Sequence, residues 1–307
     1  MTKSLQSSKV QMCPNGPEFS RFVQGYWRLN SWDMNPQQRL SFLKQHIELG
    51  VSTVDHAHVY GPPSCEELFG EALKLNSSVR QEIQIVSKCG INLNNNAVQP
   101  KQVSHYSSDR KNIIKSVETS LRRLRTDYLD ALLLHRPDFL MNVDEIAAVF
   151  SELKESGKVK FFGVSNFSAS QFLLLDSRLD SSLITNQVEI NPINFDVISD
   201  GTLDLLQQNK VSPMAWSCLA GGEIFHQQSE QIIRLRKTLL DIQNEIGASS
   251  IEQVIFAWIA KLPSNPVMII GSGKVERVIG AIESENYTLT REQWYRIWVA
   301  SKGFNVP

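Results

Sequence analysis

The sequence predicts a single-domain α/β protein built as a (β/α)8 barrel of the TIM type. Short apolar segments alternate with longer amphipathic stretches along most of the 307 residues, which is the pattern of β/α units around a parallel sheet. Eight such apolar segments can be counted, and a hydrophobic content of 42% is enough for a large core. Eight parallel units in a chain of this length favour a closed barrel over an open, doubly wound sheet.

Each unit is recognised by a strand-length apolar run followed by a helical repeat. In the first helix, Leu40, Leu43 and Ile47 share one face, and Gly50 follows as a residue that ends helices. Gly157 separates the fourth helix from the fifth strand. The predicted strands are residues 22–27, 51–55, 83–88, 128–135, 159–164, 184–190, 211–216 and 266–270. The predicted helices are residues 35–49, 64–75, 109–124, 143–156, 168–175, 202–208, 229–246, 251–261 and 274–282.

Three segments interrupt the alternation, at residues 91–108, 217–228 and 283–307. In a barrel the first two follow strands three and seven, on the face where active sites lie. In the third, Trp294 and Trp298 are i,i+4 neighbours, which indicates a helix that packs on the barrel rather than over the site. No stretch rich in Pro, Gly or Ser divides the chain, so one domain is expected over residues 1–307.

Charge and composition exclude several classes of partner. The 31 Lys and Arg residues against 32 Asp and Glu give a formal net charge of -1, which offers no general attraction for nucleic acid or an anionic membrane. The four cysteines lack paired spacing, which argues against a disulfide framework or a zinc ribbon. Residues 1–16 lack the features of a secretory signal, and no apolar run reaches the roughly 20 residues of a membrane helix. A cytoplasmic protein is expected, and its oligomeric state is not readable from the sequence.

Polar side chains fall at or just past the C-terminal ends of successive predicted strands, where a barrel brings them to one mouth. They are Asp55, Lys88, His135, Ser165, Asn166, Gln187, Trp216 and Ser272. Tyr60 follows Asp55 by a short turn, so a carboxylate, an ammonium, an imidazole and a phenol form a candidate proton-transfer cluster. A charged, buried Lys88 is expected to lower the pKa of Tyr60 from its ordinary value of about 10, which would make the phenol a usable acid.

Each of these residues also has a structural interpretation, as a solvated rim residue, a member of an ion pair or a helix cap. Their coincidence over consecutive strands favours function, and Ser168 is expected to cap the next helix while Asn166 faces the mouth. A competing hypothesis starts from His56 and His58, which resemble the H-x-H pair of barrel metallohydrolases. Such a site needs further histidines and usually an aspartate on the last strand, but strand eight ends in a Gly-Ser-Gly turn. No metal is therefore predicted.

A candidate anion-binding segment follows the last predicted strand. Gly271, Ser272, Gly273 and Lys274 lead into a helix that carries Arg277. Backbone N–H groups, a hydroxyl and two cations thus gather at one helix N-terminus, where the helix dipole favours negative charge. A Gly-Ser-Gly turn alone is a weak signal, but phosphates often bind after the last strands of a barrel.

Several short motifs occur in a fixed order along the chain. Residues 55–61 match D-x-A-x-x-Y-G, residues 163–167 match G-V-S-N-F, and residues 186–189 read N-Q-V-E. Lys88 ends the run I-V-S-K, and His135 ends L-L-L-H. Together these motifs resemble the aldo-keto reductase superfamily from Gly25 to about Ile282, and most of all a bacterial branch of uncharacterised oxidoreductases.

This resemblance implies an enzyme that reduces small aldehydes or ketones with NADP(H) held across the barrel mouth. By position, Tyr60 would donate the proton, Asp55 and Lys88 would tune it, and His135 would orient the carbonyl. The resemblance also implies cofactor contacts at the strand ends and in the loops that follow them. These positions are Gly25, Tyr26, Ser165, Asn166, Gln187, Trp216, Ser217, Leu219, Gly221, Gly271, Ser272, Gly273, Lys274 and Arg277.

The implied cofactor contacts include departures from the family. The nicotinamide ring would stack on Trp216, where the family often has Tyr, and the pyrophosphate would lie along residues 217–221. Lys274 and Arg277 favour NADPH over NADH, because cationic side chains bind the 2′-phosphate that only NADPH carries. Gly271 stands where many members carry Lys, and Ala281 stands where Asn is common, so cofactor affinity and selectivity are the properties affected.

Three hypotheses about function follow. The leading one is an NADPH-dependent carbonyl reductase; a second is an NADP(H)-binding sensor with little turnover, and a third is the metal-dependent hydrolase. The occupied tetrad, as we call Asp55, Tyr60, Lys88 and His135, favours the first. Aromatic residues either line a pocket for flat or apolar carbonyls or pack in the core. They are Trp27, Trp32, Tyr106 and Trp216.

Overall fold

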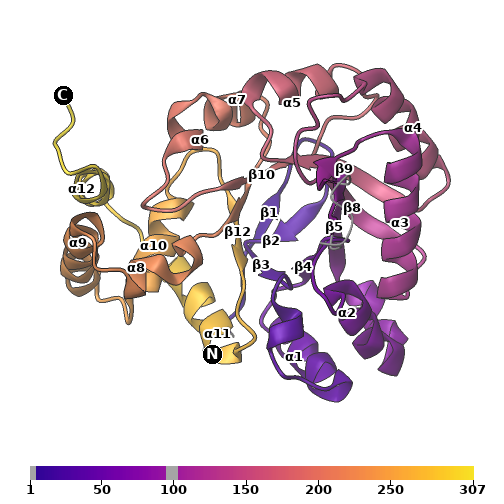
Figure 1. Ribbon diagram of the computed structural model, residues 1–307. Helices are drawn as coiled ribbons and strands as arrows, with labels where there is room; N and C mark the ends of the chain where they lie inside the picture. Colours follow the sequence, from indigo (N-terminus) through magenta and orange to yellow (C-terminus); the bar gives the residue numbers. More distant parts are fainter. Residues whose placement is uncertain (1–4, 95–102) are drawn as a thin grey trace.

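A closed barrel of eight parallel strands forms the centre of the computed structural model, which describes residues 5–94 and 103–307 (Figure 1). Around the barrel the strands follow one another in chain order, and the last one pairs with the first. They are β3 (Phe22–Gly25), β4 (Thr53–Asp55), β5 (Gln84–Cys89), β8 (Leu129–Leu134), β9 (Val159–Ser165), β10 (Asn186–Glu189), β11 (Met214–Trp216) and β12 (Val267–Ile270). Gly25 lies opposite Asp55, and β12 closes the ring against β3. The predicted fold class is confirmed.

Helices cover the outside of the barrel in the same order (Figure 1). They are α1 (Pro36–Glu48), α2 (Cys65–Leu75), α3 (Arg110–Leu124), α4 (Val143–Glu155), α5 (Ala169–Asp176), α6 (Asp196–Ser199), α7 (Thr202–Gln208), α8 (Glu223–His226), α9 (Glu230–Ile246), α10 (Ile251–Ala260), α11 (Val275–Glu283) and α12 (Arg291–Lys302). Short 3-10 turns lie at Leu29–Ser31, Ser77–Glu82, Ala220–Gly222 and Ser284–Asn286.

Local sequence signals set where the helices begin. Before α1, the Asn35 side chain accepts a hydrogen bond from the N–H of Gln38, whose side chain accepts one from the N–H of Asn35. Ser168 and Gln171 cap α5 in the same reciprocal way, as predicted for Ser168. Each such pair satisfies two N–H groups that the helix itself leaves without partners.

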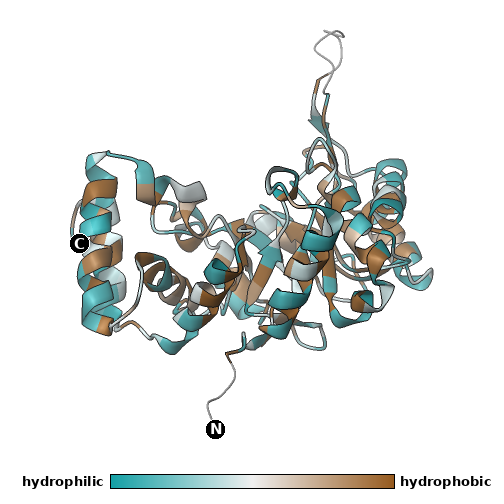
Figure 2. Ribbon diagram, turned by 90° about the horizontal axis from the view of Figure 1, so that it is seen from below, coloured by the Kyte–Doolittle hydropathy of each residue, from teal (hydrophilic) through white to brown (hydrophobic). Residues whose placement is uncertain are grey.

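Two antiparallel hairpins interrupt the β/α alternation and were not predicted. One joins β1 (Lys9–Gln11) to β2 (Glu18–Ser20), and the other joins β6 (Ile91–Asn92) to β7 (His105–Tyr106). The first contacts the end of the barrel at which the strands begin, because Ser212, just before β11, donates its N–H to the carbonyl of Met12. The second projects from the opposite end (Figure 2). Strands of two or three residues carry too little periodicity to be read from sequence.

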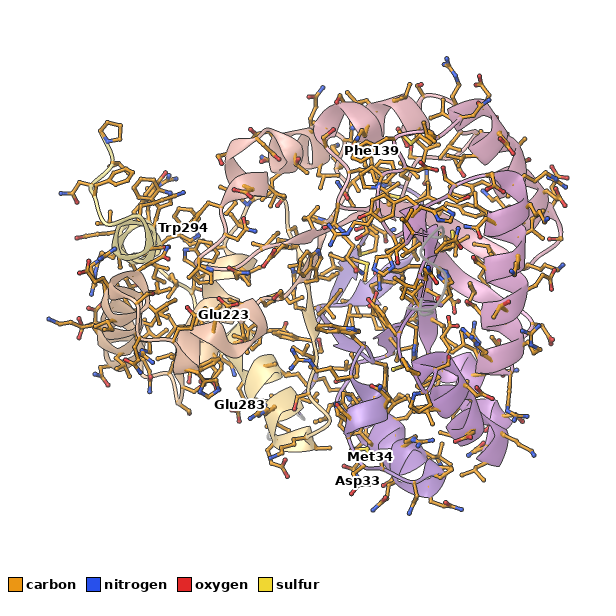
Figure 3. All side chains as sticks on the ribbon, in the orientation of Figure 1. Asp33, Met34, Phe139, Glu223, Glu283 and Trp294 are labelled. Atoms are coloured by element: carbon orange, nitrogen blue, oxygen red, sulfur yellow. The ribbon has the colours of Figure 1, made fainter. Side chains whose placement is uncertain are left out.

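The C-terminal helix packs on the barrel wall and not over the mouth, as predicted. Trp294 of α12 stacks on Trp258 of α10, with ring centroids 5.0 Å apart, and Figure 3 labels Trp294 on the side of α12 that faces the barrel. The indole N–H of each tryptophan donates to the backbone carbonyl of the other. Within the described ranges, no helix has both the length and the apolar character needed to cross a membrane.

Candidate active site

Lys88 is the central residue of the mouth. It lies near the end of β5, its side chain is fully buried, and its Nζ donates hydrogen bonds to Asp55 Oδ1 at 2.6 Å, to the His56 carbonyl at 2.8 Å and to Tyr60 Oη at 3.0 Å. An ammonium has three N–H donors, so all of them are used. Burial by itself lowers the pKa of Lys88, but Asp55 and Tyr60 outweigh burial and hold this pKa above its ordinary value. Lys88 is therefore charged.

Asp55, the last residue of β4, has both carboxylate oxygens engaged. Oδ1 accepts from Lys88, and Oδ2 accepts from Gln187 Nε2 at 2.8 Å. Gln187 is the second residue of β10, which spans Asn186–Glu189 instead of the predicted residues 184–190. Its side chain reaches Asp55 through the barrel interior, since β4 and β10 are not neighbours in the ring. The carboxylate is thus fixed from two strands.

Tyr60 lies in the turn that joins β4 to α2. Its carbonyl accepts from the N–H of Cys65, the first residue of α2. Gly61 follows with φ at +108°, and a Cβ at this position would lie 2.0 Å from the Pro63 carbonyl oxygen. Only glycine fits such a turn. The turn holds the phenol ring with its centroid 4.9 Å from Lys88 Nζ.

The expected pKa of Tyr60 needs correction. Lys88 does lower the pKa of the phenol, as predicted, but burial raises it more strongly and Asp55 raises it further, so the net pKa lies above the ordinary value. Desolvation penalises the phenolate because a charge is costly away from water. Tyr60 therefore carries its proton at neutral pH, beside a cation that favours its loss.

His135 lies just past β8, facing Tyr60. The two rings meet edge to face with centroids 5.8 Å apart, and the backbone N–H of His135 donates to the Cys89 carbonyl. Burial, followed by the charges of Lys88 and Arg136, lowers the pKa of His135 to about 2. Its buried Nδ1 has no hydrogen-bond partner within the described part of the chain. The ring is therefore neutral and presents one N–H donor.

Asn166 joins the ends of three strands. Its Nδ2 donates to Ser165 Oγ at 2.8 Å and to the His135 carbonyl at 3.3 Å, and its Oδ1 accepts from Trp216 Nε1 at 3.1 Å. Ser165 Oγ in turn donates to the Gln187 carbonyl at 2.9 Å. The structure thus brings these four predicted residues together with the tetrad, and it fixes the plane of the Trp216 ring.

The segment after β12 has the features of an anion site. Lys274 is the residue before α11, and no side chain caps this helix. The N–H of Lys274 donates to Ser272 Oγ at 3.2 Å, and Lys274 and Arg277 are exposed. Neither cation has an ion-pair partner among residues 5–94 and 103–307. Gly273 packs against Trp32, since a Cβ there would lie 2.6 Å from that indole, whereas a Cβ on Gly271 would meet open space.

The loop after β11 has an anchor that the sequence did not indicate. Ser217 adopts φ +54° and Gly221 φ +63°, and Leu219 lies between them, half-buried. Asn191 Nδ2 donates to the Ser217 carbonyl at 3.1 Å and to Glu189 Oε1 at 3.0 Å. Asn191 carries no recognisable motif, so its role becomes visible only when the loops after β10 and β11 are seen side by side.

Of the implied cofactor contacts Gly25 and Tyr26, the second turns its side chain away from the mouth. Tyr26 is 1% exposed, stacks on His56, and shares a 2.8 Å hydrogen bond between its hydroxyl and His46 Nε2. Gly25 lies against β12, where a Cβ would approach Ile269 to 2.7 Å. Because the Tyr26 hydroxyl bonds to His46 of α1, the ring lies in the core. The Tyr26 side chain is therefore not available to a cofactor, so contacts of Gly25 and Tyr26 with one would be made by the backbone.

The two histidines of the competing metal hypothesis differ in their surroundings. His56 is fully buried against Tyr26, and its pKa is lowered to about 3 by burial and then by Lys88. Both ring nitrogens of His58 lie within hydrogen-bond distance of carbonyls, at 2.7 Å from Lys88 O and 2.9 Å from Ile91 O. Among the residues that the structure describes, no three His, Cys, Asp or Glu side chains gather as metal ligands.

The aromatic residues divide between mouth and core. Trp27 is 60% exposed, and its ring centroid lies 6.5 Å from that of Tyr60, at the edge of the mouth. Trp32 instead packs on Tyr26 and Phe42. The rim is therefore aromatic on the side of β3, while Trp32 is half-buried and packs against the core.

Comparisons with known proteins identify the family. The model of the Aldo/keto reductase family matches residues 21–301. The chain is 54% identical over 299 residues to Oxidoreductase YdhF of Escherichia coli, covering 97% of this chain and 99% of that protein. It is 36% identical over 290 residues to 6-dehydroglucose reductase of Agrobacterium fabrum, covering 94% and 96% of the two chains.

A solved structure gives the same fold. The thermostable aldo-keto reductase Tm1743, determined with the inhibitor epalrestat, has a TM-score of 0.79 and 27% identity, with 95% of this chain and 99% of that chain covered. The match to the family model spans the tetrad and every other predicted site residue. The chain belongs to the aldo/keto reductase family and is an oxidoreductase.

Proposed function

We propose that this enzyme reduces small aldehydes and ketones to alcohols with NADPH, and that Tyr60 donates the proton. The observation that carries the proposal is the distance of 3.0 Å between Lys88 Nζ and Tyr60 Oη, with Asp55 holding the same ammonium. A protonated phenol beside a fixed cation is suited to general acid catalysis, because the cation stabilises the phenolate that proton transfer leaves behind.

The residues around the mouth fit a dinucleotide with an extra phosphate. Lys274 and Arg277 are exposed cations at an uncapped helix N-terminus, which suits a 2′-phosphate. A Cβ on Gly221 would meet open space, so backbone there is accessible to a ligand. Ser165 and Gln187 would hold the nicotinamide amide beside Asn166. NADPH, when bound, supplies the hydride that reduces the carbonyl carbon.

The chain's own groups act on the carbonyl oxygen. Negative charge grows on this oxygen as the carbon is reduced, and donors already aimed at it stabilise the transition state. Tyr60 Oη donates a hydrogen bond and then its proton, which forms the O–H of the alcohol and leaves a phenolate next to Lys88. The neutral His135 ring donates its N–H to the same oxygen and so orients the substrate.

Further observations support this assignment over the alternatives. The relative from Agrobacterium fabrum is named a reductase of 6-dehydroglucose, which is a small carbonyl compound. A sensor with little turnover would not need a complete tetrad. Cys13, Cys65, Cys89 and Cys218 are all free and buried, which fits a reducing compartment, and we place the enzyme in the cytoplasm on that basis.

The test is NADPH oxidation, followed by absorbance, with a panel of aldehydes, dicarbonyls and ketones. We expect turnover by the wild-type enzyme and a loss of at least about 100-fold in kcat for Tyr60→Phe, in line with the usual contribution of a general acid. Tyr128→Phe is the matched control, because that phenol lies between Arg80 and Lys160 before β8, far from the mouth. Equal kcat for Tyr60→Phe and wild type would refute the proton-donor role.

A further inference from the structure

Arg136 is a cation at the mouth to which the mechanism assigns no role. It follows His135 in the loop after β8, it is half-buried, and its Cζ lies 5.9 Å from the ring centroid of Trp216. Its charge is close enough to His135 to contribute to the lowered pKa of that imidazole. The guanidinium therefore lies near Trp216, on which the nicotinamide would stack, and its residue adjoins His135, which would orient the carbonyl.

Arg136 has no anionic partner in the part of the chain that the structure describes. Lys88, the cation of the tetrad, is neutralised by Asp55 at 2.6 Å. Glu189, at the end of β10, accepts from the amides of Asn191 and Asn194 at 3.0 and 3.1 Å. The tetrad and Arg136 together thus carry one net positive charge, and it resides on Arg136.

The loop that carries Arg136 is fixed on both sides. Before it, the N–H of His135 donates to the Cys89 carbonyl at 2.9 Å. After it, Asp138 Oδ2 accepts from the N–H and the hydroxyl of Ser108 at 2.9 and 3.0 Å, and Oδ1 accepts from the N–H of Leu140 at 2.9 Å. Figure 3 labels Phe139 in this loop. A guanidinium on a fixed backbone is prepared for a ligand at a defined place.

We propose that Arg136 selects carbonyl substrates that carry an anionic group, a carboxylate or a phosphate, a few bonds from the carbonyl carbon. A guanidinium binds such a group through two parallel N–H donors, and its partly desolvated setting strengthens the bond. The carbonyl oxygen would lie between Tyr60 and His135 while the anion reaches Arg136 beside Trp216. This inference rests on the proposed function and names the substrate class of that same site.

The experiment compares succinic semialdehyde with its neutral amide, which has nearly the same shape. We expect the wild-type enzyme to favour the carboxylate in kcat/KM. In Arg136→Gln this preference should fall about tenfold or more, the usual effect of losing a hydrogen bond to a charged group. The value of kcat/KM for the amide should change by less than about twofold. Arg136→Lys should keep part of the preference for the carboxylate, since lysine keeps the positive charge but lacks the two parallel N–H donors of a guanidinium.

Arg28→Gln is the matched control, because Arg28 is a second arginine at the mouth, 5.0 Å from the Trp27 ring centroid. If both variants lost the preference equally, general attraction of anions and not Arg136 would be responsible, and the proposal would be wrong. A fall in kcat/KM for both substrates in Arg136→Gln alone would also contradict it, since this would mean that Arg136 only supports Trp216.

A binding measurement separates this proposal from the proposed function. Calorimetric titration of the same two compounds into the protein needs no turnover. Tighter binding of the carboxylate by the wild type than by Arg136→Gln supports the anion site even if no substrate is reduced. Equal binding of acid and amide by both proteins overturns the anion site even if both compounds are reduced.

Discussion

Gln187 Nε2 donates a 2.8 Å hydrogen bond to Asp55 Oδ2, although the two residues are 132 positions apart in the chain. With Lys88 on the other oxygen, the carboxylate cannot rotate away from the ammonium. The position of Lys88, and through it the environment of the Tyr60 phenol, thus depends on a residue that the resemblance to reductases assigns to the cofactor. The proposed cofactor contact Gln187 and the proposed proton donor Tyr60 thus share one hydrogen-bond network.

Replacing Gln187 by Leu should therefore affect stability and cofactor binding together. The substitution leaves Asp55 Oδ2 buried without its donor, which costs about 1–3 kcal/mol in the free energy of unfolding. The KM for NADPH should rise because the nicotinamide amide loses a partner. Urea unfolding and NADPH titration measure the two effects. Unchanged stability would mean that Asp55 does not depend on Gln187.

Asp55→Asn should lower kcat about tenfold or more while the protein stays folded. The buried Lys88 would lose its counter-ion, its pKa would fall, and it would stabilise the phenolate of Tyr60 less. Asp130→Asn is the control, because Asp130 forms a buried ion pair with Arg80 at 2.8 Å near the start of β8. The control should lose stability and keep kcat; similar losses of kcat in both variants would count against the tetrad.

Acidification should destabilise the protein below about pH 6.5, the ordinary pKa of histidine. Burial, as the main cause in each case, lowers the pKa of His46 to about 4, of His56 to about 3 and of His135 to about 2. Between the unfolded and folded values the unfolded chain binds more protons, so the free energy of unfolding falls as pH falls. Urea midpoints measured from pH 7 to pH 5 should decrease, and His46→Gln should flatten the slope. A midpoint independent of pH would contradict the neutral, buried rings.

Arg277→Ala should weaken NADPH binding about tenfold or more and leave NADH binding unchanged, because only NADPH carries the 2′-phosphate that we propose Arg277 binds. Fluorescence titration with both nucleotides measures this. Arg178→Ala is the control, since Arg178 pairs with Asp144 beyond the C-terminal end of α5. If Arg277→Ala weakened both nucleotides alike, the phosphate would lie elsewhere.

Much of the fold could be predicted because the barrel strands are continuous apolar runs and the helices carry caps. Two features could not be predicted, namely the register of β3 against β12 and the N-terminal hairpin. The strand Lys9–Gln11 has three residues with one buried side chain, which is too short a segment to show a strand period. The predicted positions of Asp55, Lys88 and Tyr60 converged because parallel strands end at one face.

The parts of the site that could not be predicted depend on packing. Tyr26 follows Gly25 directly, yet its hydroxyl meets His46, twenty positions away on α1. Asn191 lies in a loop without a motif, and only the fold brings it to Ser217. For Tyr60 the sequence correctly indicated that Lys88 lowers the pKa of the phenol. The larger, opposite effect of burial on this pKa depends on how far the folded protein excludes water, which a sequence does not show.

The most direct test of the central relationship is an NMR titration of Tyr60 with ring-labelled tyrosine. The chain has six tyrosines, and Tyr60→Phe identifies the signal. We expect the Tyr60 resonance to titrate above the ordinary pKa of tyrosine, and its pKa to rise further in Lys88→Met, because the opposing charge is gone. A Tyr60 pKa that stayed the same or fell in Lys88→Met would contradict the claim that Lys88 prepares this phenol to give up its proton.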